Sequence, residues 1–224
     1  MGTRPRPTRT QTRWGRLSSV FPASRARAMH QHMARLCVLF EDLRIELLGM
    51  AAEDLEALDH TGSKVRRLYF QRRSVGTLFE FAEALRLLDE CPDFSDIKDR
   101  FDAHSLRLWS RAVRFFRRQE RFLKRIRHDV GGHFGSVAAG FAVENFGPFD
   151  SGSMELALYG SQGGGVTFSF AREVAATALF RNLRGCTPQR KVDRFLLLSR
   201  VAYRHAIRAV ECIAGSYLWE RFTL

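Results

Sequence analysis

The chain of 224 residues has little cysteine and no long apolar run. Its four cysteines lie far apart and none forms a CxxC pair, which argues against both a disulfide-stapled fold and a zinc knuckle. They are Cys37, Cys91, Cys186 and Cys212. No apolar stretch near 18 residues is free of charge, so we expect no membrane-spanning helix. Together these features favour a cytoplasmic protein with reduced thiols.

The motifs of the common hydrolases and metalloenzymes are missing as well. The sequence contains no GxSxG, no HExxH and no paired-carboxylate arrangement, and its glycine loop at 159–165 lacks the Lys-Ser/Thr of a P-loop. His30 and His32 are two residues apart and cannot share a helical face as metal ligands. We therefore expect neither a metal nor a cofactor.

Positive charge, in contrast, is abundant and uneven. Thirty-six Lys and Arg against 24 Asp and Glu give a net charge of +12, which favours a polyanion such as nucleic acid as partner. Residues 1–28 contain no acid and are rich in Arg, Thr, Ser and Pro, so we predict a basic disordered arm. The arm is open to four interpretations: a phosphate-binding arm, a transit-like peptide, a translation start at Met29 or Met33, and a solvated tail.

Residues 29–224 are predicted to form one helical domain, because apolar residues recur there at helical spacing. Two β-like runs, Met154–Tyr159 and Val166–Phe170, flank the glycine-rich loop. The predicted helices span about 28–50, 64–89, 96–129, 133–145, 172–183 and 190–221. The expected fold class is therefore mainly all-α: a bundle of five or six helices with a small β-hairpin insertion near 154–170.

The helix expected at 96–129 has arginines along one face. At about 100° per residue, six of them fall within a narrow sector, opposite a wider apolar sector that must face the core or a partner. This arginine stripe consists of Arg107, Arg111, Arg114, Arg118, Arg121 and Arg125. Six like charges on one face repel one another, so the stripe favours contact with phosphates or partner carboxylates. The alternative is a solvated face balanced by acids of a neighbouring helix.

Arg127 departs from the stripe. The same helical wheel places it with Trp109 and Phe116, on the packed side of the helix. A semi-buried arginine needs a partner, because an uncompensated buried charge costs about 3–5 kcal/mol. The candidate partners are Asp129, Glu144, Glu80 and Glu83. A structural salt bridge and a phosphate contact are both open for this side chain.

Residues 127–133 read RHDVGGH: five residues, the first of them the polar His128, separate an arginine from a histidine. This string resembles the signature of the HEPN superfamily of helical domains. The resemblance implies a metal-independent endoribonuclease that acts as a homodimer and leaves a 2′,3′-cyclic phosphate and a 5′-OH. It also implies that His133 handles the proton of the 2′-OH or leaving group, that Arg127 holds the scissile phosphate and that His128 orients or supports them.

Many such enzymes belong to bacterial defence or toxin systems, where an antitoxin-like protein is the expected partner, whereas other HEPN domains only bind or dimerise. Two features depart from the pattern: Gly131-Gly132 within the motif and the extra hairpin around Gly163. The sequence thus predicts a HEPN-like RNA-binding protein or endoribonuclease. The alternative is a non-catalytic helical module that binds nucleic acid or a protein through the arginine stripe. In that case Arg127 would be structural and His133 would be a helix N-cap or a core histidine.

Overall fold

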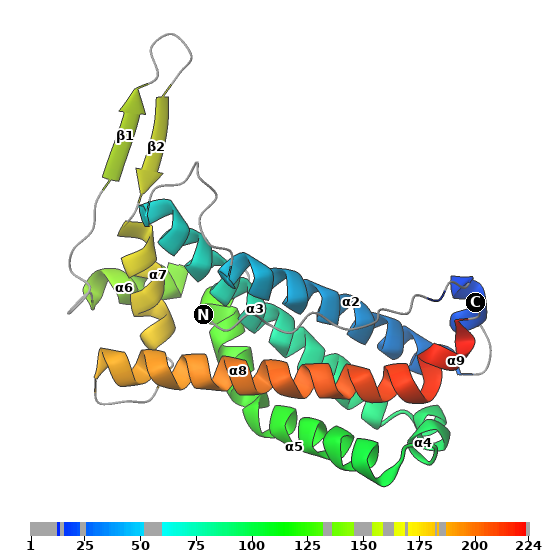
Figure 1. The fold of residues 1–224 in the computed structure, drawn as a ribbon. Helices are drawn as coiled ribbons and strands as arrows, with labels where there is room; N and C mark the ends of the chain where they lie inside the picture. Colours follow the sequence, from blue (N-terminus) through cyan, green and yellow to red (C-terminus); the bar gives the residue numbers. More distant parts are fainter. Residues whose placement is uncertain are drawn as a thin grey trace, which may run out of the picture.

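The computed structural model confirms the mainly all-α fold class (Figure 1). No helix in the part of the chain that it describes is long and apolar enough to cross a bilayer. The residues described are 13, 16–22, 26–51, 60–131, 136–145, 154–158, 164–168, 170–181, 183 and 187–222.

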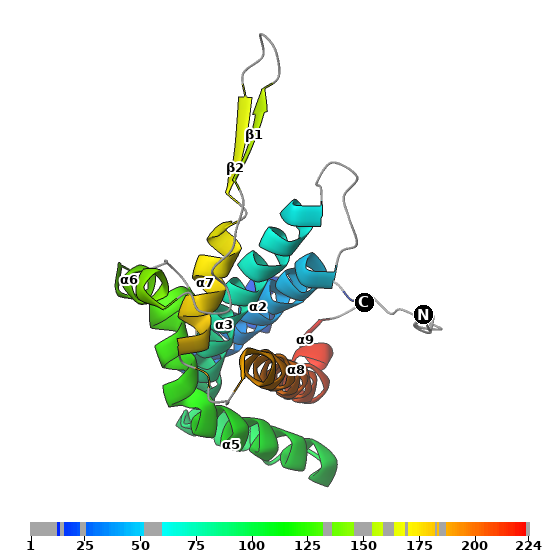
Figure 2. The ribbon, with the colours of Figure 1, turned by 90° about the vertical axis from the view of Figure 1, so that its left-hand side faces the viewer.

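Four long helices build the body of the molecule: α2 (Arg27–Ala51), α3 (His60–Asp89), α5 (Ala103–Ile126) and α8 (Pro188–Ile213). Helix α2 lies along α3, and α5 packs against both α3 and α8 (Figures 1 and 2). Large apolar side chains from these helices are fully enclosed, as their helical spacing predicts. Among them are Met33, Leu36, Phe81, Leu85, Trp109 and Phe116.

A break between α3 and α5 makes the predicted helix at 96–129 start too early. Pro92 begins the short helix α4 (Pro92–Lys98), where its missing N–H costs nothing. Asp102 then caps α5 by accepting a hydrogen bond from the Ser105 N–H at 2.6 Å. The prediction of five or six helices is wrong, because α4 and the short helices α1 (Leu17–Val20) and α9 (Trp219–Arg221) come in addition.

Two of the long helices end in a π-helical turn. Helix α5 continues into η1 (Arg127–Gly131), and α8 continues into η4 (Ala214–Leu218). The wider turn of η1 contacts α3, α5 and α7 (Phe170–Arg181). The motif residues Arg127, His128 and Asp129 therefore lie where α5 meets the neighbouring helices.

The segment after the motif forms α6 (Ser136–Glu144) and two strands, β1 (Met154–Leu158) and β2 (Gly164–Phe168). The strands pair antiparallel, with Met154 opposite Phe168 and Leu158 opposite Gly164. Strand β2 begins two residues before the apolar run at Val166, because Gly164 and Gly165 take part in the pairing. The ribbon projects away from the helices, at the α6–α7 end of the molecule (Figure 1).

The predicted arm boundary at residue 28 differs from the structure. Residues 16–22 are described and contain α1, whose Val20 is fully buried in the core. Arg13 donates a hydrogen bond to the Trp219 carbonyl oxygen at 2.8 Å, and its guanidinium lies 4.2 Å from the centroid of the Trp219 ring. The apolar Val20 explains the difference, since burying it stabilises an ordered turn. Residues 1–12 lie outside the described part.

Candidate functional site

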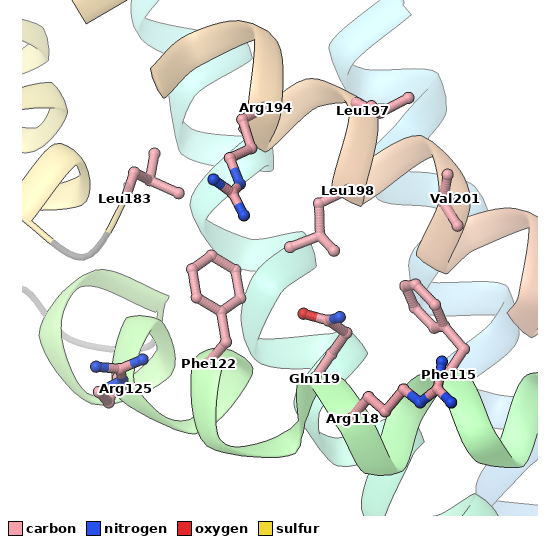
Figure 3. A pocket seen from close by; sticks show the side chains of 10 residues that line it. All are labelled: Phe115, Arg118, Gln119, Phe122, Arg125, Leu183, Arg194, Leu197, Leu198 and Val201. Carbon is pink, nitrogen blue, oxygen red and sulfur yellow. The ribbon is translucent and has the colours of Figure 1, made fainter. Parts of the chain in front are cut away.

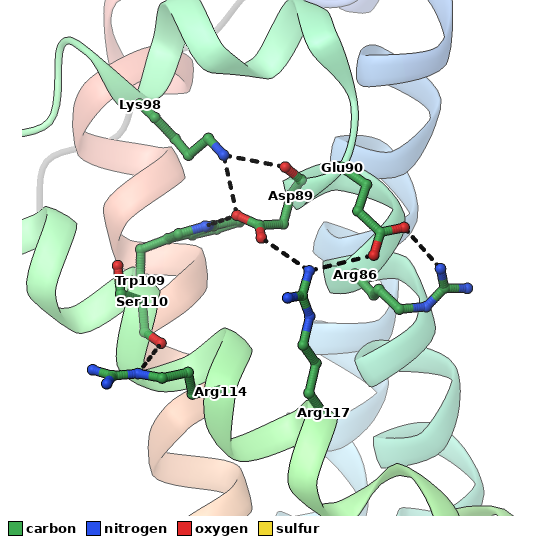
Figure 4. Close-up of polar contacts among 8 residues, drawn as sticks. All are labelled: Arg86, Asp89, Glu90, Lys98, Trp109, Ser110, Arg114 and Arg117. Atoms are coloured by element: carbon green, nitrogen blue, oxygen red, sulfur yellow. Dashed lines mark hydrogen bonds and ion pairs between the residues drawn. The ribbon is translucent and has the colours of Figure 1, made fainter.

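The arginine stripe lies on the exposed face of α5. All six of its side chains are exposed, and none forms an ion pair with a described acidic residue. Arg114 bonds only along its own helix, from Nε to the Ser110 carbonyl oxygen at 3.3 Å (Figure 4). The opposite side of α5 is buried, with Trp109, Phe116 and Leu123 in the core. This packing fixes the helix so that the stripe faces solvent.

A different side of α5 carries a cation that the fold neutralises. The Arg117 guanidinium lies 3.3 Å from a Glu90 carboxylate oxygen and 3.6 Å from one of Asp89 (Figure 4). Asp89 also accepts a hydrogen bond from the Trp109 indole N–H at 2.8 Å and lies 3.3 Å from the Lys98 ammonium. Acids at the end of α3 thus hold α4 and α5 in place.

A pocket of about 500 Å³ opens between α5 and α8, next to the arginine stripe (Figure 3). We call it the α5–α8 pocket. Its lining residues are Phe115, Arg118, Gln119, Phe122, Arg125, Leu183, Arg194, Leu197, Leu198 and Val201. In Figure 3, Arg194 points into the pocket from α8, toward Phe122 and Gln119 of α5. The pocket therefore combines an apolar wall with three guanidinium groups, two of them from the stripe.

His205 of α8 lies beside the pocket, against one of its lining residues. Its ring stacks on Phe115, with centroids 4.7 Å apart and an interplanar angle of 26°. Burial lowers the pKa of His205 below the ordinary histidine value, and the charges of Arg208, Arg204 and Arg111 lower it further. Cations of both helices consequently converge on one seam, where a polyanion would find a favourable potential.

The contribution of α8 was missed by sequence reasoning, although a signal for it exists. Arg190, Arg194 and Arg208 fall within roughly 40° of one another on a helical wheel. This second row is easily overlooked, because Leu197 and Val201 share its sector and make the face look apolar. The packing of α8 against α5 is needed to see that Arg194 lines the same pocket as Arg118 and Arg125.

Arg127 pairs with an acid that was among its predicted partners. Its terminal nitrogen lies 2.5 Å from a Glu80 carboxylate oxygen, and its guanidinium lies 4.9 Å from the Phe79 ring centroid. Arg35 of α2 also hydrogen-bonds Glu80, and it bonds Glu83 at 2.7 Å. Arg127 is 40% exposed. The ion pair thus belongs to a network that ties η1, α3 and α2 together while leaving one side of Arg127 open to solvent.

The two histidines of the motif have no described contact with Arg127. His128 is exposed on η1, and His133 lies outside the described residues. The roles that the HEPN resemblance implies for Arg127, His128 and His133 therefore stay predictions. Across the described ranges, no group of three His, Cys, Asp or Glu side chains is placed to hold a metal ion.

Comparison with known proteins gives no relative from which a role could be transferred. The chain matches no family model, and neither a curated protein nor a solved structure matches it.

Proposed function

We propose that this protein binds RNA along the seam between α5 and α8. The observation that carries the proposal is the arginine stripe, whose six exposed side chains lack described acid partners. Two of them, Arg118 and Arg125, line a pocket to which Arg194 adds a further cation. A helix rises 1.5 Å per residue, so the stripe extends over roughly 27 Å, enough to follow several phosphates. The choice of RNA over DNA comes from the resemblance of residues 127–133 to the HEPN signature.

The phosphate groups of a bound RNA would provide the negative charges that no described acidic residue provides to the stripe. Each arginine that neutralises a phosphate releases a condensed counterion, so affinity falls steeply as salt increases. Arginine also presents planar N–H donors that match phosphate oxygens. The proposed interface therefore predicts strong, salt-dependent and largely sequence-independent binding.

Two adjacent arginines allow a matched test by fluorescence anisotropy with a labelled single-stranded RNA. Arg118→Gln is expected to weaken binding about threefold to tenfold and to reduce the slope of log affinity against log salt by about 0.7. Arg117→Gln removes the same charge one residue away and is expected to leave the affinity almost unchanged, because Arg117 is paired with Asp89 and Glu90. The triple variant Arg118→Gln, Arg125→Gln, Arg194→Gln is expected to reduce the slope by about 2. Equal weakening by the two single variants, or no binding by the wild type, contradicts the proposal.

RNA cleavage is the second candidate function, favoured by the backbone of the motif. Residues Arg127–Gly131 form a π-helical turn, a rare conformation that occurs frequently at functional sites. Arg127 would have to exchange Glu80 for the scissile phosphate, with His133 and His128 in the roles that the HEPN resemblance implies. The homodimer and the antitoxin-like partner of a defence or toxin system follow from the same HEPN resemblance.

Cleavage is tested by incubating a labelled single-stranded RNA with the protein in the presence of EDTA. The wild type is expected to cut, leaving 2′,3′-cyclic phosphate ends, whereas His133→Ala and Arg127→Ala are expected to be inactive. Arg35→Ala is the control, because it disturbs the same Glu80 and Glu83 network without altering the motif. Thermal unfolding of each variant verifies the fold. RNA that stays intact with the wild type refutes cleavage and leaves the binding proposal standing.

A further inference from the structure

The α5–α8 pocket offers more than charge. Phe115, Phe122 and Leu198 give it an apolar wall, and Gln119 places an amide among them (Figure 3). An amide can both donate and accept hydrogen bonds, as the edge of a nucleobase requires. At about 500 Å³ the pocket has the size typical of small-molecule sites.

The residues that line the pocket include cationic and aromatic side chains, and these occupy different parts of it. Arg118 and Arg125 come from the stripe, and Arg194 enters from α8, so cations approach the pocket from both helices. The aromatic side chains lie between them, and His205 stacked on Phe115 extends the flat surface along the seam. A fitting ligand therefore has a flat apolar part next to negative charge.

A single-stranded nucleic acid has both parts, because its unpaired bases can leave the stack while its phosphates stay outside. Stacking of such a base on an aromatic side chain strengthens binding and accepts any base, because every base has a π-face. A duplex keeps its bases paired and stacked, so it could reach the arginines but not the apolar wall. Charge complementarity and pocket shape thus favour a single strand over a duplex.

We propose that the α5–α8 pocket holds one unpaired base of a single-stranded nucleic acid against Phe122 and Leu198, while Arg118, Arg125 and Arg194 contact the flanking phosphates. This inference rests on the proposed function, since it uses the same interface. It goes further by naming the substrate class, single strand rather than duplex, and the residues that select it.

Two leucines of α8 provide a matched test. Leu198→Trp adds a large side chain to the pocket, whereas Leu196→Trp places the same side chain on α8 at an exposed position that does not line the pocket. The probes are a 12-nucleotide single-stranded RNA with a central 2-aminopurine and the blunt duplex of the same sequence, compared at one salt concentration. The wild type is expected to bind the single strand at least tenfold more tightly than the duplex. Leu198→Trp is expected to lose about tenfold for the single strand only, and Leu196→Trp to match the wild type for both probes.

The fluorescence of 2-aminopurine reports directly on the base. We expect it to change when the single strand binds the wild type or Leu196→Trp, and to change less with Leu198→Trp. Phe122→Leu, which keeps an apolar side chain but removes the ring, is expected to weaken single-strand binding about fivefold even if Leu198→Trp does not fold.

Three outcomes contradict the inference. If the wild type binds single strand and duplex equally while Arg118→Gln still weakens binding, the base pocket is refuted and the interface stands. If folded Leu198→Trp weakens both probes equally, or neither, the pocket does not select a base. If the wild type binds neither probe, both the inference and the proposed function fail.

Discussion

Arg117 and Arg118 are neighbours in the chain but lie on different sides of α5. Arg117 faces Asp89 and Glu90, which come from the end of α3. Arg118 is turned by about 100° on the helix and borders a pocket, without an ion pair to a described acid. The difference shows that, among the described residues, the carboxylates paired with α5 lie on the side where α3, α4 and α5 meet.

The Asp89 side is organised for stability. Asp89 is mostly buried and receives the Trp109 N–H, and Trp109 itself packs between Phe94 and Phe101, with ring centroids 4.8 and 6.0 Å away. Exposed ion pairs contribute only about 0–1 kcal/mol each, so the bond to the buried indole matters more than the contact with Arg117. The stripe has no comparable structural role, which leaves its charges available to a ligand.

The largest expected effect comes from removing the acid of the stabilising side. Asp89→Ala leaves the Trp109 N–H without its acceptor and removes the partner of Lys98 and Arg117, so the free energy of unfolding should fall by about 2–3 kcal/mol. Urea denaturation measures this loss. Glu90→Ala, which removes exposed contacts only, is the control and should cost less than about 1 kcal/mol. Equal losses would show that the indole bond is unimportant.

Adding a carboxylate to the pocket beside the stripe should weaken RNA binding. Leu197 is 63% exposed and lines the pocket, so Leu197→Glu places a carboxylate among Arg118, Arg125 and Arg194. We expect RNA affinity to fall about tenfold, or about 1.4 kcal/mol, with no loss of thermal stability. Leu196→Glu makes the same charge change outside the pocket and should reduce the affinity less. A similar loss in both variants would point to net charge instead of a local site.

Glu46 contrasts with the exposed arginines of the stripe, because it is a buried acid with few hydrogen-bond partners. One carboxylate oxygen accepts a hydrogen bond from the Thr77 hydroxyl at 2.7 Å, and Arg73 is 4.0 Å away. The other oxygen has no hydrogen-bond partner among the described residues. Burial raises the pKa of Glu46 above the ordinary glutamate value, although Thr77 and Arg73 oppose the shift.

Replacing Glu46 by its amide tests whether this buried charge lowers the stability of the protein. Because the pKa of Glu46 is raised on folding, its contribution to stability decreases as pH rises from the ordinary glutamate pKa through the folded value. Glu46→Gln can keep the Thr77 bond and removes the buried charge, so at pH 7 the unfolding midpoint should rise by roughly 2–4 °C. At pH 4 the gain should shrink, and RNA binding should be unchanged at either pH. A loss of stability at pH 7 would contradict this account.

The smallest expected effect is a change in histidine titration. Phosphates bound along the seam would offset Arg208, Arg204 and Arg111, so RNA should raise the pKa of His205 toward the ordinary histidine value, measured by NMR. His32 is the internal control, since burial and Arg35 lower its pKa away from the pocket. Without RNA, the lowered pKa of His205 means that protein stability rises with pH from the folded value to the ordinary one, and falls on acidification through that window. A His205 titration that RNA leaves unchanged would argue against binding at this seam.

Local features of the fold were predictable from sequence. The spacing of arginines and apolar residues within 103–126 defines both faces of α5, and the position of Arg127 outside the stripe follows from the same periodicity. The Asp102 cap was a visible signal for the break between α4 and α5, but the continuous periodicity after Asp96 obscured it.

Contacts between distant residues could not be predicted in this way. The α5–α8 pocket depends on how two helices about 80 residues apart in sequence pack together, and neither helix alone indicates an opening. The bond between Trp109 and Asp89 likewise depends on the turn that α4 introduces. The four-member partner set for Arg127 included Glu80, but choosing Glu80 required the packing of η1 against α3.

The π-helical turns at the ends of α5 and α8 make the fold more sensitive to the number of residues in these turns than to their identity. A π turn hydrogen-bonds i to i+5, one residue more than an α turn, so each turn has the form of a single-residue insertion. Deleting one residue within 127–131 would restore α-helical continuity and rotate everything that follows by about 100°. The contacts of the later η1 residues and the path of the chain toward α6 would then change, even with every side chain outside the deletion preserved. Length variants in homologues or libraries should thus be tolerated outside these two turns before they are tolerated inside them.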